Sequence, residues 1–178
     1  MPGTPGRRPA TEEPMNVPLP KYAERGPIHD VVWVPLKFYH DQRGWLVELF
    51  RNDLIDPKFH PVMAYVSQTK PGVARGPHEH VDQSDYFCFT GPSTFRVYLW
   101  DARKDSPTYG KKEVREVGED AAYALIVPPG VVHAYKNVGG KDGLVFNGAN
   151  RLYAGWLKQD PVDEIRHEHD TNSPYQLD

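Results

Sequence analysis

The chain of 178 residues has few of the features that mark several protein classes. It has one cysteine, Cys88, which excludes an internal disulfide. It has no run of about 18 apolar residues that could span a membrane, and its N-terminus lacks the apolar stretch of a secretion signal. The net charge of -3 combines both signs, so no basic surface for nucleic acid is expected. We expect a soluble, cytoplasmic protein that binds neither nucleic acid nor a membrane.

Proline and aromatic residues are plentiful instead. The sequence has 18 prolines and 12% aromatic residues, a mixture that favours short strands and turns over long helices. Its hydrophobic share of 39% is enough for one core. Residues 1–26 are rich in proline, glycine and charge, and we interpret them as a flexible N-terminal arm. Residues 27–178 are then predicted to form a single domain.

Short apolar runs separated by turn residues continue from Val31 to the last third of the chain. They predict strands at residues 31–34, 45–50, 62–68, 86–90, 95–101, 114–117, 123–127, 133–137 and 144–147. Helix is scarce, with one turn expected at 52–55 and a polar, potentially helical stretch at 160–169. The pattern predicts an all-β sandwich or barrel.

Two histidine motifs stand in the two halves of this pattern. The first is Gly72-Val-Ala-Arg-Gly-Pro-His78-Glu-His80, which is followed by Asp85. The second is Pro128-Pro-Gly-Val-Val-His133-Ala-Tyr-Lys-Asn137. Together they resemble the two motifs of the cupins, except that cupins usually have Glu where this chain has Asp85. The resemblance implies a cupin double-stranded β-helix, that is, a jelly-roll barrel.

The spacing of these residues suggests a shared site. Residues two apart in a strand lie on one face, so His78 and His80 should point the same way, and His133 should share a face with Tyr135. Inward side chains of a small barrel converge on one cavity. His78, His80, Asp85 and His133 could hold a divalent transition metal there. The alternative is that these histidines are catalytic or hydrogen-bonded without a metal.

Further motifs give a narrower resemblance. They are Asp41-Gln-Arg43-Gly-Trp-Leu-Val-Glu48-Leu-Phe-Arg51, Gly72-Val-Ala-Arg75-Gly-Pro-His78, Asp101-Ala-Arg103 with Ser106-Pro-Thr-Tyr-Gly-Lys111, and Pro128-Pro-Gly-Val-Val-His133. In this combination the chain resembles the dTDP-4-dehydrorhamnose 3,5-epimerase family. The resemblance implies an epimerase or isomerase that acts on a nucleotide-linked 4-keto-6-deoxy sugar by removing a proton next to the ketone.

The resemblance also implies roles for matched residues. His78 corresponds to the general base, and Asp170 to its carboxylate partner. Arg75 corresponds to an arginine near the keto oxygen or the phosphate, and His133 to a second active-site histidine of the substrate site. A nearby carboxylate favours the charged form of an imidazole, which makes the pairing of His78 with Asp170 chemically reasonable.

The nucleotide is expected to be held from a neighbouring subunit. Arg43 and Glu48 match positions that the family uses for this purpose, so the resemblance implies a homodimer. It implies no cofactor. If the histidines and Asp85 form a metal site instead, one divalent transition metal is expected.

Two positions depart from the family pattern. The family's catalytic tyrosine corresponds by counting to Phe146, which cannot donate a proton, so Tyr135 or Tyr153 is the expected substitute. The family's active-site lysine corresponds to Asp85. The activity could therefore change one carbon or two, or shift a keto group. A metal-dependent cupin isomerase or dioxygenase, or a cupin that binds sugar nucleotides without turnover, stays open as an alternative.

Overall fold

The computed structural model describes residue 21 and residues 23–178, and most of its regular structure is β-strand. The larger sheet has the strand order β1-β2-β10-β7-β12-β5, with antiparallel neighbours. These strands are β1 (Glu24–Arg25), β2 (Val32–Pro35), β10 (Tyr123–Val127), β7 (Asp85–Phe89), β12 (Gly143–Ala149) and β5 (Met63–Thr69).

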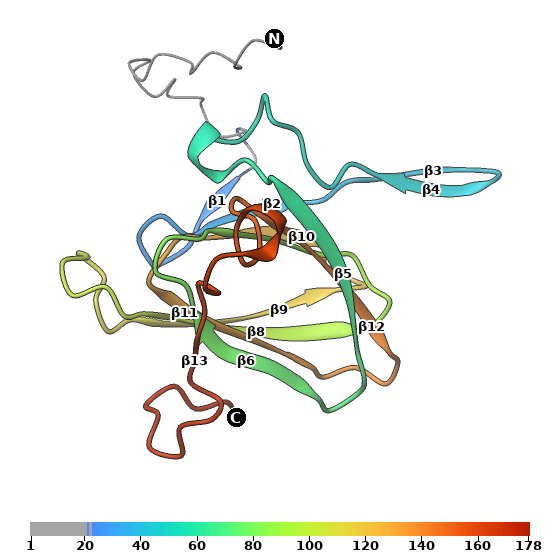
Figure 1. The fold of residues 1–178 in the computed structure, drawn as a ribbon. Helices are drawn as coiled ribbons and strands as arrows, with labels where there is room; N and C mark the ends of the chain where they lie inside the picture. Colours follow the sequence, from blue (N-terminus) through green and yellow to red (C-terminus); the bar gives the residue numbers. More distant parts are fainter. Residues whose placement is uncertain (1–20, 22) are drawn as a thin grey trace, which may run out of the picture.

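The second sheet faces the first, and together they form the predicted jelly-roll barrel (Figure 1). Its order is β13-β6-β11-β8-β9, again antiparallel. These strands are β13 (Ile165–Arg166), β6 (Ala74–Glu79), β11 (Val131–Asn137), β8 (Thr94–Asp101) and β9 (Lys112–Gly118). The all-β cupin prediction is confirmed.

The main core lies between the two sheets. Alternate residues of a strand point to one face, and Phe87 and Phe89 of β7 meet Val131 and Tyr135 of β11 in one buried cluster. The residue between the two phenylalanines, Cys88, faces the other way and is fully buried in a second cluster outside the large sheet. Cys88 is therefore a core residue, as its aromatic surroundings in the sequence suggest.

The strands predicted from apolar runs are present, and the strand at 123–127 has the predicted bounds. The helix expected at 160–169 is wrong. That segment contains β13, which pairs with β6, so pairing with the sheet prevails over the local sequence there. Residues 52–55 form a turn. The helical segments among the described residues are two short 3-10 turns, Pro57–Phe59 and Trp156–Lys158.

The sheet begins inside the segment interpreted as an arm. Glu24 and Arg25 of β1 pair with Trp33 and Val32 of β2. The Glu24 carboxylate also accepts hydrogen bonds from the Arg115 guanidinium at 2.9 Å and from a tyrosine hydroxyl at 3.0 Å. Ordered β-structure thus starts before residue 27, and the rest of the predicted arm, residues 1–20 and 22, lies outside the described residues.

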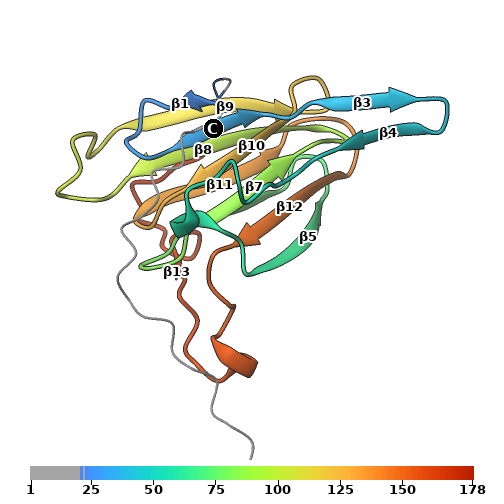
Figure 2. The ribbon, with the colours of Figure 1, turned by 90° about the horizontal axis from the view of Figure 1, so that it is seen from above.

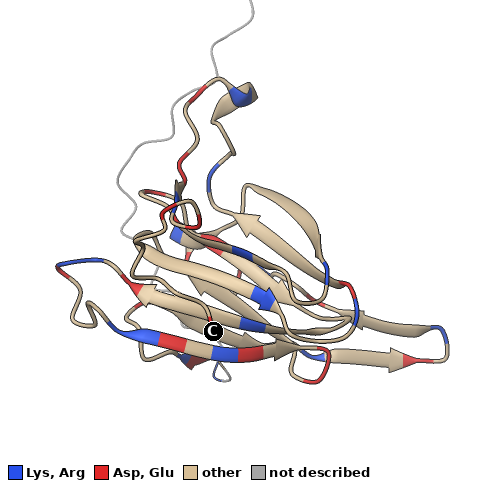
Figure 3. Cartoon of the chain, turned by 90° about the horizontal axis from the view of Figure 1, so that it is seen from below, with Lys and Arg blue, Asp and Glu red and all other residues tan. Residues whose placement is uncertain are grey.

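A hairpin leaves the barrel on one side. It consists of β3 (Phe38–Asp41) and β4 (Gly44–Val47) and projects well beyond the two sheets (Figures 1 and 2). Cationic and anionic residues are interspersed over the barrel and its loops (Figure 3). Among the described residues, no helix is long and apolar enough to cross a membrane.

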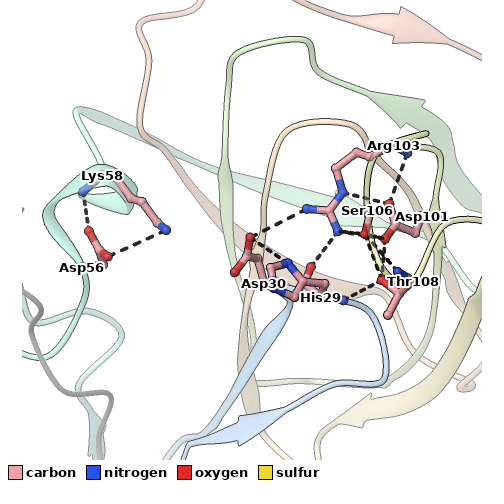
Figure 4. Close-up of polar contacts among 8 residues, drawn as sticks. All are labelled: His29, Asp30, Asp56, Lys58, Asp101, Arg103, Ser106 and Thr108. Atoms are coloured by element: carbon pink, nitrogen blue, oxygen red, sulfur yellow. Dashed lines mark hydrogen bonds and ion pairs between the residues drawn. The ribbon is translucent and has the colours of Figure 1, made fainter.

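The loop after β8 is fixed by a buried carboxylate. Asp101 accepts hydrogen bonds from Arg103 Nε at 2.8 Å and from the Ser106 and Thr108 hydroxyls, both at 2.6 Å (Figure 4). Arg103 also donates to the backbone oxygen of His29 at 2.7 Å. These contacts join the loop to the segment before β2, and the same loop also donates a backbone hydrogen bond from Ala102 to Gly130, at the turn before β11.

Candidate active site

Strands β6 and β11 bring two of the motif histidines together. His78 lies opposite His133 in the ladder, and the ring centroids are 4.4 Å apart. This close approach requires Gly76, which has φ +80°, and a Cβ atom there would lie 2.6 Å from the backbone oxygen of His133. The glycine before the first histidine is thus a steric requirement of the site.

His80 follows directly after β6 and is held from two sides. Its backbone oxygen accepts a hydrogen bond from Gly130 N at 2.9 Å, and Gly130, at φ +73°, makes the predicted turn before β11. Its Nδ1 bonds the backbone oxygen of Asp163. The Asp163 carboxylate in turn accepts hydrogen bonds from the backbone N–H groups of the three residues after His80.

Asp85, the first residue of β7, is the carboxylate that these histidines share. It is 2% exposed, and its Oδ2 lies 3.1 Å from His80 Nε2 and 3.2 Å from His133 Nε2. Its Oδ1 accepts hydrogen bonds from the Gln83 and Asn147 amides, each at 3.0 Å. Burial disfavours the charge of Asp85, but the two histidines outweigh burial and hold its pKa well below the usual range.

His78 is in a different state. Burial, with a contribution from neighbouring His133, lowers its pKa to about 2. The ring is therefore neutral at pH 7, which is the form that can accept a proton. No residue that the structure describes forms a hydrogen bond with its ring nitrogens.

His78 and His80 line a large pocket. Its volume is about 930 Å³, enough for a ligand larger than a simple sugar. His78, His80, Arg75, Tyr65 and Tyr135 contribute to its wall. Arg75 is fixed there by hydrogen bonds from its guanidinium to the Thr69 hydroxyl at 3.0 Å and to the Gln68 backbone oxygen at 2.8 Å.

Comparison with known proteins identifies the family of this chain. A sequence model of the dTDP-4-dehydrorhamnose 3,5-epimerase family matches residues 25–154, well over half of the chain. The chain belongs to this family. The match includes β6, β7 and β11, which contain His78, Asp85 and His133, and it includes His80 directly after β6. It does not include Asp163 or β13.

Two curated relatives of this epimerase-family chain have names that refer to glycan or polysaccharide biosynthesis. One is the probable low-salt glycan biosynthesis epimerase Agl13 of Haloferax volcanii, 38% identical over 139 residues, which cover 77% of this chain and 86% of that protein. The other is the spore coat polysaccharide biosynthesis protein SpsL of Bacillus subtilis, 38% identical over 104 residues, which cover 57% of this chain and 66% of that protein.

Solved structures share the fold. A dTDP sugar isomerase from Desulfovibrio desulfuricans G20 has a TM-score of 0.70 at 22% identity, over 84% of this chain and 92% of that chain. The epimerase RmlC from Legionella pneumophila, in complex with dTDP-4-keto-L-rhamnose, has a TM-score of 0.68 at 18% identity, over 81% and 76%.

Three residues with roles implied by the epimerase-family resemblance lie away from the pocket. Asp170 is exposed, its carboxylate accepts a hydrogen bond from the backbone N–H of Asn172, and it makes no contact with His78 among the described residues. Arg43 is at the tip of the hairpin, bonded to Asp41 at 2.5 Å. Glu48 is not in the pocket wall either. The carboxylate that contacts His80 and His133 is Asp85, and the pairing of Asp170 with His78 stays a prediction.

Strand β12 contains Phe146, the residue that corresponds by counting to the family's catalytic tyrosine. Phe146 faces the outer cluster that contains Cys88, and its neighbour Asn147 faces inward toward Asp85. Tyr135, the expected substitute, lies in the pocket wall with its hydroxyl 3.0 Å from Ser67 Oγ, and Tyr153 also lines the pocket.

Sequence reasoning missed Tyr65 in β5. Its hydroxyl accepts a hydrogen bond from Asn147 Nδ2 at 2.9 Å and lies in the pocket wall. Burial raises its pKa to about 12, so the hydroxyl is protonated at pH 7. Tyr65 and Ser67 are two apart in the apolar run of β5, a spacing that predicts that both side chains lie on one face of the strand.

Proposed function

We propose that this protein epimerises a nucleotide-linked 4-keto-6-deoxy sugar by removing a proton from a carbon next to the ketone. The observation that carries this proposal is a neutral, buried imidazole, His78, in the wall of a large pocket beside a fixed cation, Arg75. A proton next to a ketone is acidic because its loss gives an enolate. Removing it needs a base and a positive group near the oxygen.

Side chains that line this pocket can carry out each step of the reaction. His78 takes the proton from the carbon, the C–H electron pair forms a carbon–carbon double bond, and the carbonyl electron pair moves to the oxygen. Arg75 stabilises the resulting negative charge. A tyrosine hydroxyl then donates a proton to the opposite face of the carbon, the ketone reforms, and solvent resets both side chains. The negative charges of the substrate raise the basicity of His78.

The nucleotide of the substrate is proposed from a relative and from the arginines of the pocket. The relative in Legionella pneumophila is described in complex with dTDP-4-keto-L-rhamnose, which has the required ketone and a diphosphate. Arg75, Arg151 and Arg166 all contribute to the wall of the pocket in this chain and can pair with phosphate oxygens. We infer that dTDP-4-keto-6-deoxyglucose is a suitable first substrate, and that the protein acts in glycan synthesis as its curated relatives do.

A homodimer completes the site in this proposal. The hairpin whose turn contains Arg43 projects away from its own barrel, which supports a role for Arg43 in the site of another subunit. Tyr39, Trp45 and Leu46 of the hairpin are 50%, 58% and 61% exposed, an apolar surface of the kind that proteins bury in interfaces. The cytoplasmic location stays a prediction from the sequence.

The test is deuterium exchange. The protein is incubated with dTDP-4-keto-6-deoxyglucose in D2O, and C3 and C5 of the sugar are followed by NMR. We expect deuterium at C3, or at C3 and C5, together with inversion at the same carbon. His78→Gln should abolish both. Binding of the nucleotide sugar without exchange in the wild-type protein would refute catalysis and favour a binding protein.

The same assay identifies the acid. We expect Tyr135→Phe to keep deuterium uptake from the His78 face but to lose inversion by about 10²–10⁴-fold, because only the proton donor of the opposite face is removed. Tyr65→Phe and Tyr153→Phe are matched controls that each remove one pocket hydroxyl. Loss of inversion in Tyr65→Phe instead would assign the acid to Tyr65.

A further inference from the structure

Tyr135 has a fixed ring and a hydroxyl that reaches the opposite sheet. The residue is 5% exposed, and its ring centroid lies 5.8, 5.6 and 5.7 Å from those of Phe87, Phe89 and Phe95, edge-on in each case. The hydroxyl lies 3.0 Å from Ser67 Oγ in β5. Because the ring is packed on these sides, the groups around its oxygen decide where the hydroxyl hydrogen points.

Two hydroxyls of β5 meet this oxygen. Ser67 and Thr69 are two residues apart, so their side chains lie on one face of the strand. Thr69 is 2% exposed, and its oxygen accepts a hydrogen bond from Arg75 Nε at 3.0 Å. The single hydrogen of the Thr69 hydroxyl is then available for another oxygen, and that oxygen belongs to Tyr135.

These contacts change the acidity of Tyr135 in the direction that proton donation needs. Burial raises the pKa of this tyrosine, whereas a hydrogen bond with Ser67, the charge of Arg75 and a hydrogen bond with Thr69 act against the rise. Each of the three contacts favours the phenolate, which is the form that remains when the proton has left.

The geometry points to Ser67 and Thr69 as positioning residues for proton donation by Tyr135. Both hydroxyls donate to the tyrosine oxygen, so the tyrosine's own hydrogen is left to point into the pocket. The inference deepens the proposed function and rests on it, because it names the groups that hold the acid of the same site. Neither residue belongs to the motifs that carry the family resemblance.

The step that these residues support is the second proton transfer. The Tyr135 O–H bond breaks, the hydrogen bonds to the carbon through the electron pair of the enolate double bond, and the ketone re-forms. The tyrosine oxygen keeps the electron pair of its broken bond and becomes negative. An oxygen anion only accepts, so the contacts with Ser67 and Thr69 are strongest as this charge develops. Neither hydroxyl loses its hydrogen, and water returns a proton to the tyrosine.

Thr69 differs from Ser67 because it also contacts the cation. Arg75 lies opposite Tyr135 in the ladder of β6 and β11, and its Nε donates to Thr69. During the second transfer the negative charge moves from the ketone oxygen, which Arg75 stabilises, to the tyrosine oxygen. Thr69 therefore serves both proton transfers, and Ser67 serves the second alone.

Deletion of each hydroxyl separates the two residues in the D2O assay. Ser67→Ala should keep deuterium uptake from the His78 face and slow inversion by about 10–100-fold, because a hydrogen bond to a charged oxygen is lost. Thr69→Val should slow uptake as well, since Arg75 also loses a contact. Ser67→Thr and Thr69→Ser retain the hydroxyls and should restore most of the rate.

Thr90→Val is the matched control, because it removes a hydroxyl directly after β7 that is not in the pocket wall. It should change neither uptake nor inversion. Ser67→Ala combined with Tyr135→Phe should invert no more slowly than Tyr135→Phe alone, because both changes act through one group. Additive losses would refute the positioning role, and so would full inversion in Ser67→Ala.

A measurement without substrate keeps this inference separate from the reaction. Tyrosine is labelled with ¹³C at Cζ, and the NMR signal of Tyr135 is the one lost in Tyr135→Phe. Ser67→Ala and Thr69→Val should each shift this signal, and Thr90→Val should not. An unshifted signal in Ser67→Ala would refute the inference, whether or not Thr69→Val folds. A shifted signal, together with a wild-type protein that shows no exchange, supports the contacts and refutes only the reaction.

Discussion

At the scale of single residues, a carboxylate in this fold is defined by the donors that surround it. Asp101 and Asp85 are both buried, yet one contacts hydroxyls and a guanidinium and the other contacts imidazoles. Burial alone would favour the neutral acid in both cases. The surrounding groups reverse this, so Asp101 stays charged and stabilises a loop, and Asp85 stays charged between two histidines.

Asp101 gives a pH-dependent prediction. Burial works against its charge, but Arg103, Ser106 and Thr108 outweigh burial and hold its pKa well below the usual range. A lowered pKa stabilises the folded protein above the pKa of the unfolded chain, about 4, and this stability is lost as the pH falls toward the folded value. We expect Asp101→Asn to lower the free energy of unfolding by about 2–4 kcal/mol at pH 7.

The measurement is urea unfolding at pH 7 and pH 3. The difference between the wild type and Asp101→Asn should shrink at pH 3, because the wild type has then lost part of the contribution of Asp101. Asp105→Asn, at an exposed position of the same loop, is the control and should change little at either pH. An equal difference at both pH values would show that the charge of Asp101 is not the stabilising feature.

At the scale of elements, the histidine motifs predict the residues of the site better than the apolar runs do. Residues two apart share a face, so the spacing relates His78 to His80, and the resemblance to the cupin motifs predicts that Asp85 and His133 reach the same cavity. β6 itself was absent from the apolar runs, since Gly76 and Pro77 interrupt it. Partners that come from distant segments, such as Asn147 and Asp163, leave no local signal, because their contacts depend on how the strands pair.

Asp163 is such a distant partner, and we expect it to be a positioning residue for His80. Its carboxylate accepts hydrogen bonds from the backbone N–H groups of Val81, Asp82 and Gln83 at 2.8, 2.9 and 2.9 Å. Asp163→Ala leaves these donors without their partner and should lower the free energy of unfolding by about 1–3 kcal/mol. It should also lower kcat for deuterium exchange, because His80 and the Asp85 carboxylate beside it lose their orientation.

Urea unfolding and the deuterium-exchange assay on the same samples check this expectation. Asp163→Asn keeps one acceptor oxygen and should recover part of both effects. A purely structural residue would change the unfolding free energy and leave kcat for deuterium exchange unchanged, so that outcome would remove Asp163 from the site.

At the scale of the whole molecule, one barrel holds only part of the proposed site. His78 and His80 line the pocket, whereas Arg43, between β3 and β4, and Glu48, directly after β4, do not. In a two-fold symmetric dimer, each hairpin can reach the other barrel, and both sites are completed by the same contact. A monomer should then bind the nucleotide weakly and hold the sugar in a poor position for proton removal.

Mixed dimers test this arrangement. Arg43→Ala and His78→Ala proteins should each be weakly active or inactive. When their subunits exchange, about half of the dimers are hybrids, and each hybrid has one site with both native residues, so activity should return to about a quarter of the wild-type rate. Mixing Arg43→Ala with Glu48→Ala is the control. Both changes then affect the same side of each site, and no hybrid has an intact one. Recovery in the control, or none in the first mixture, would mean that the hairpin does not serve the partner's pocket.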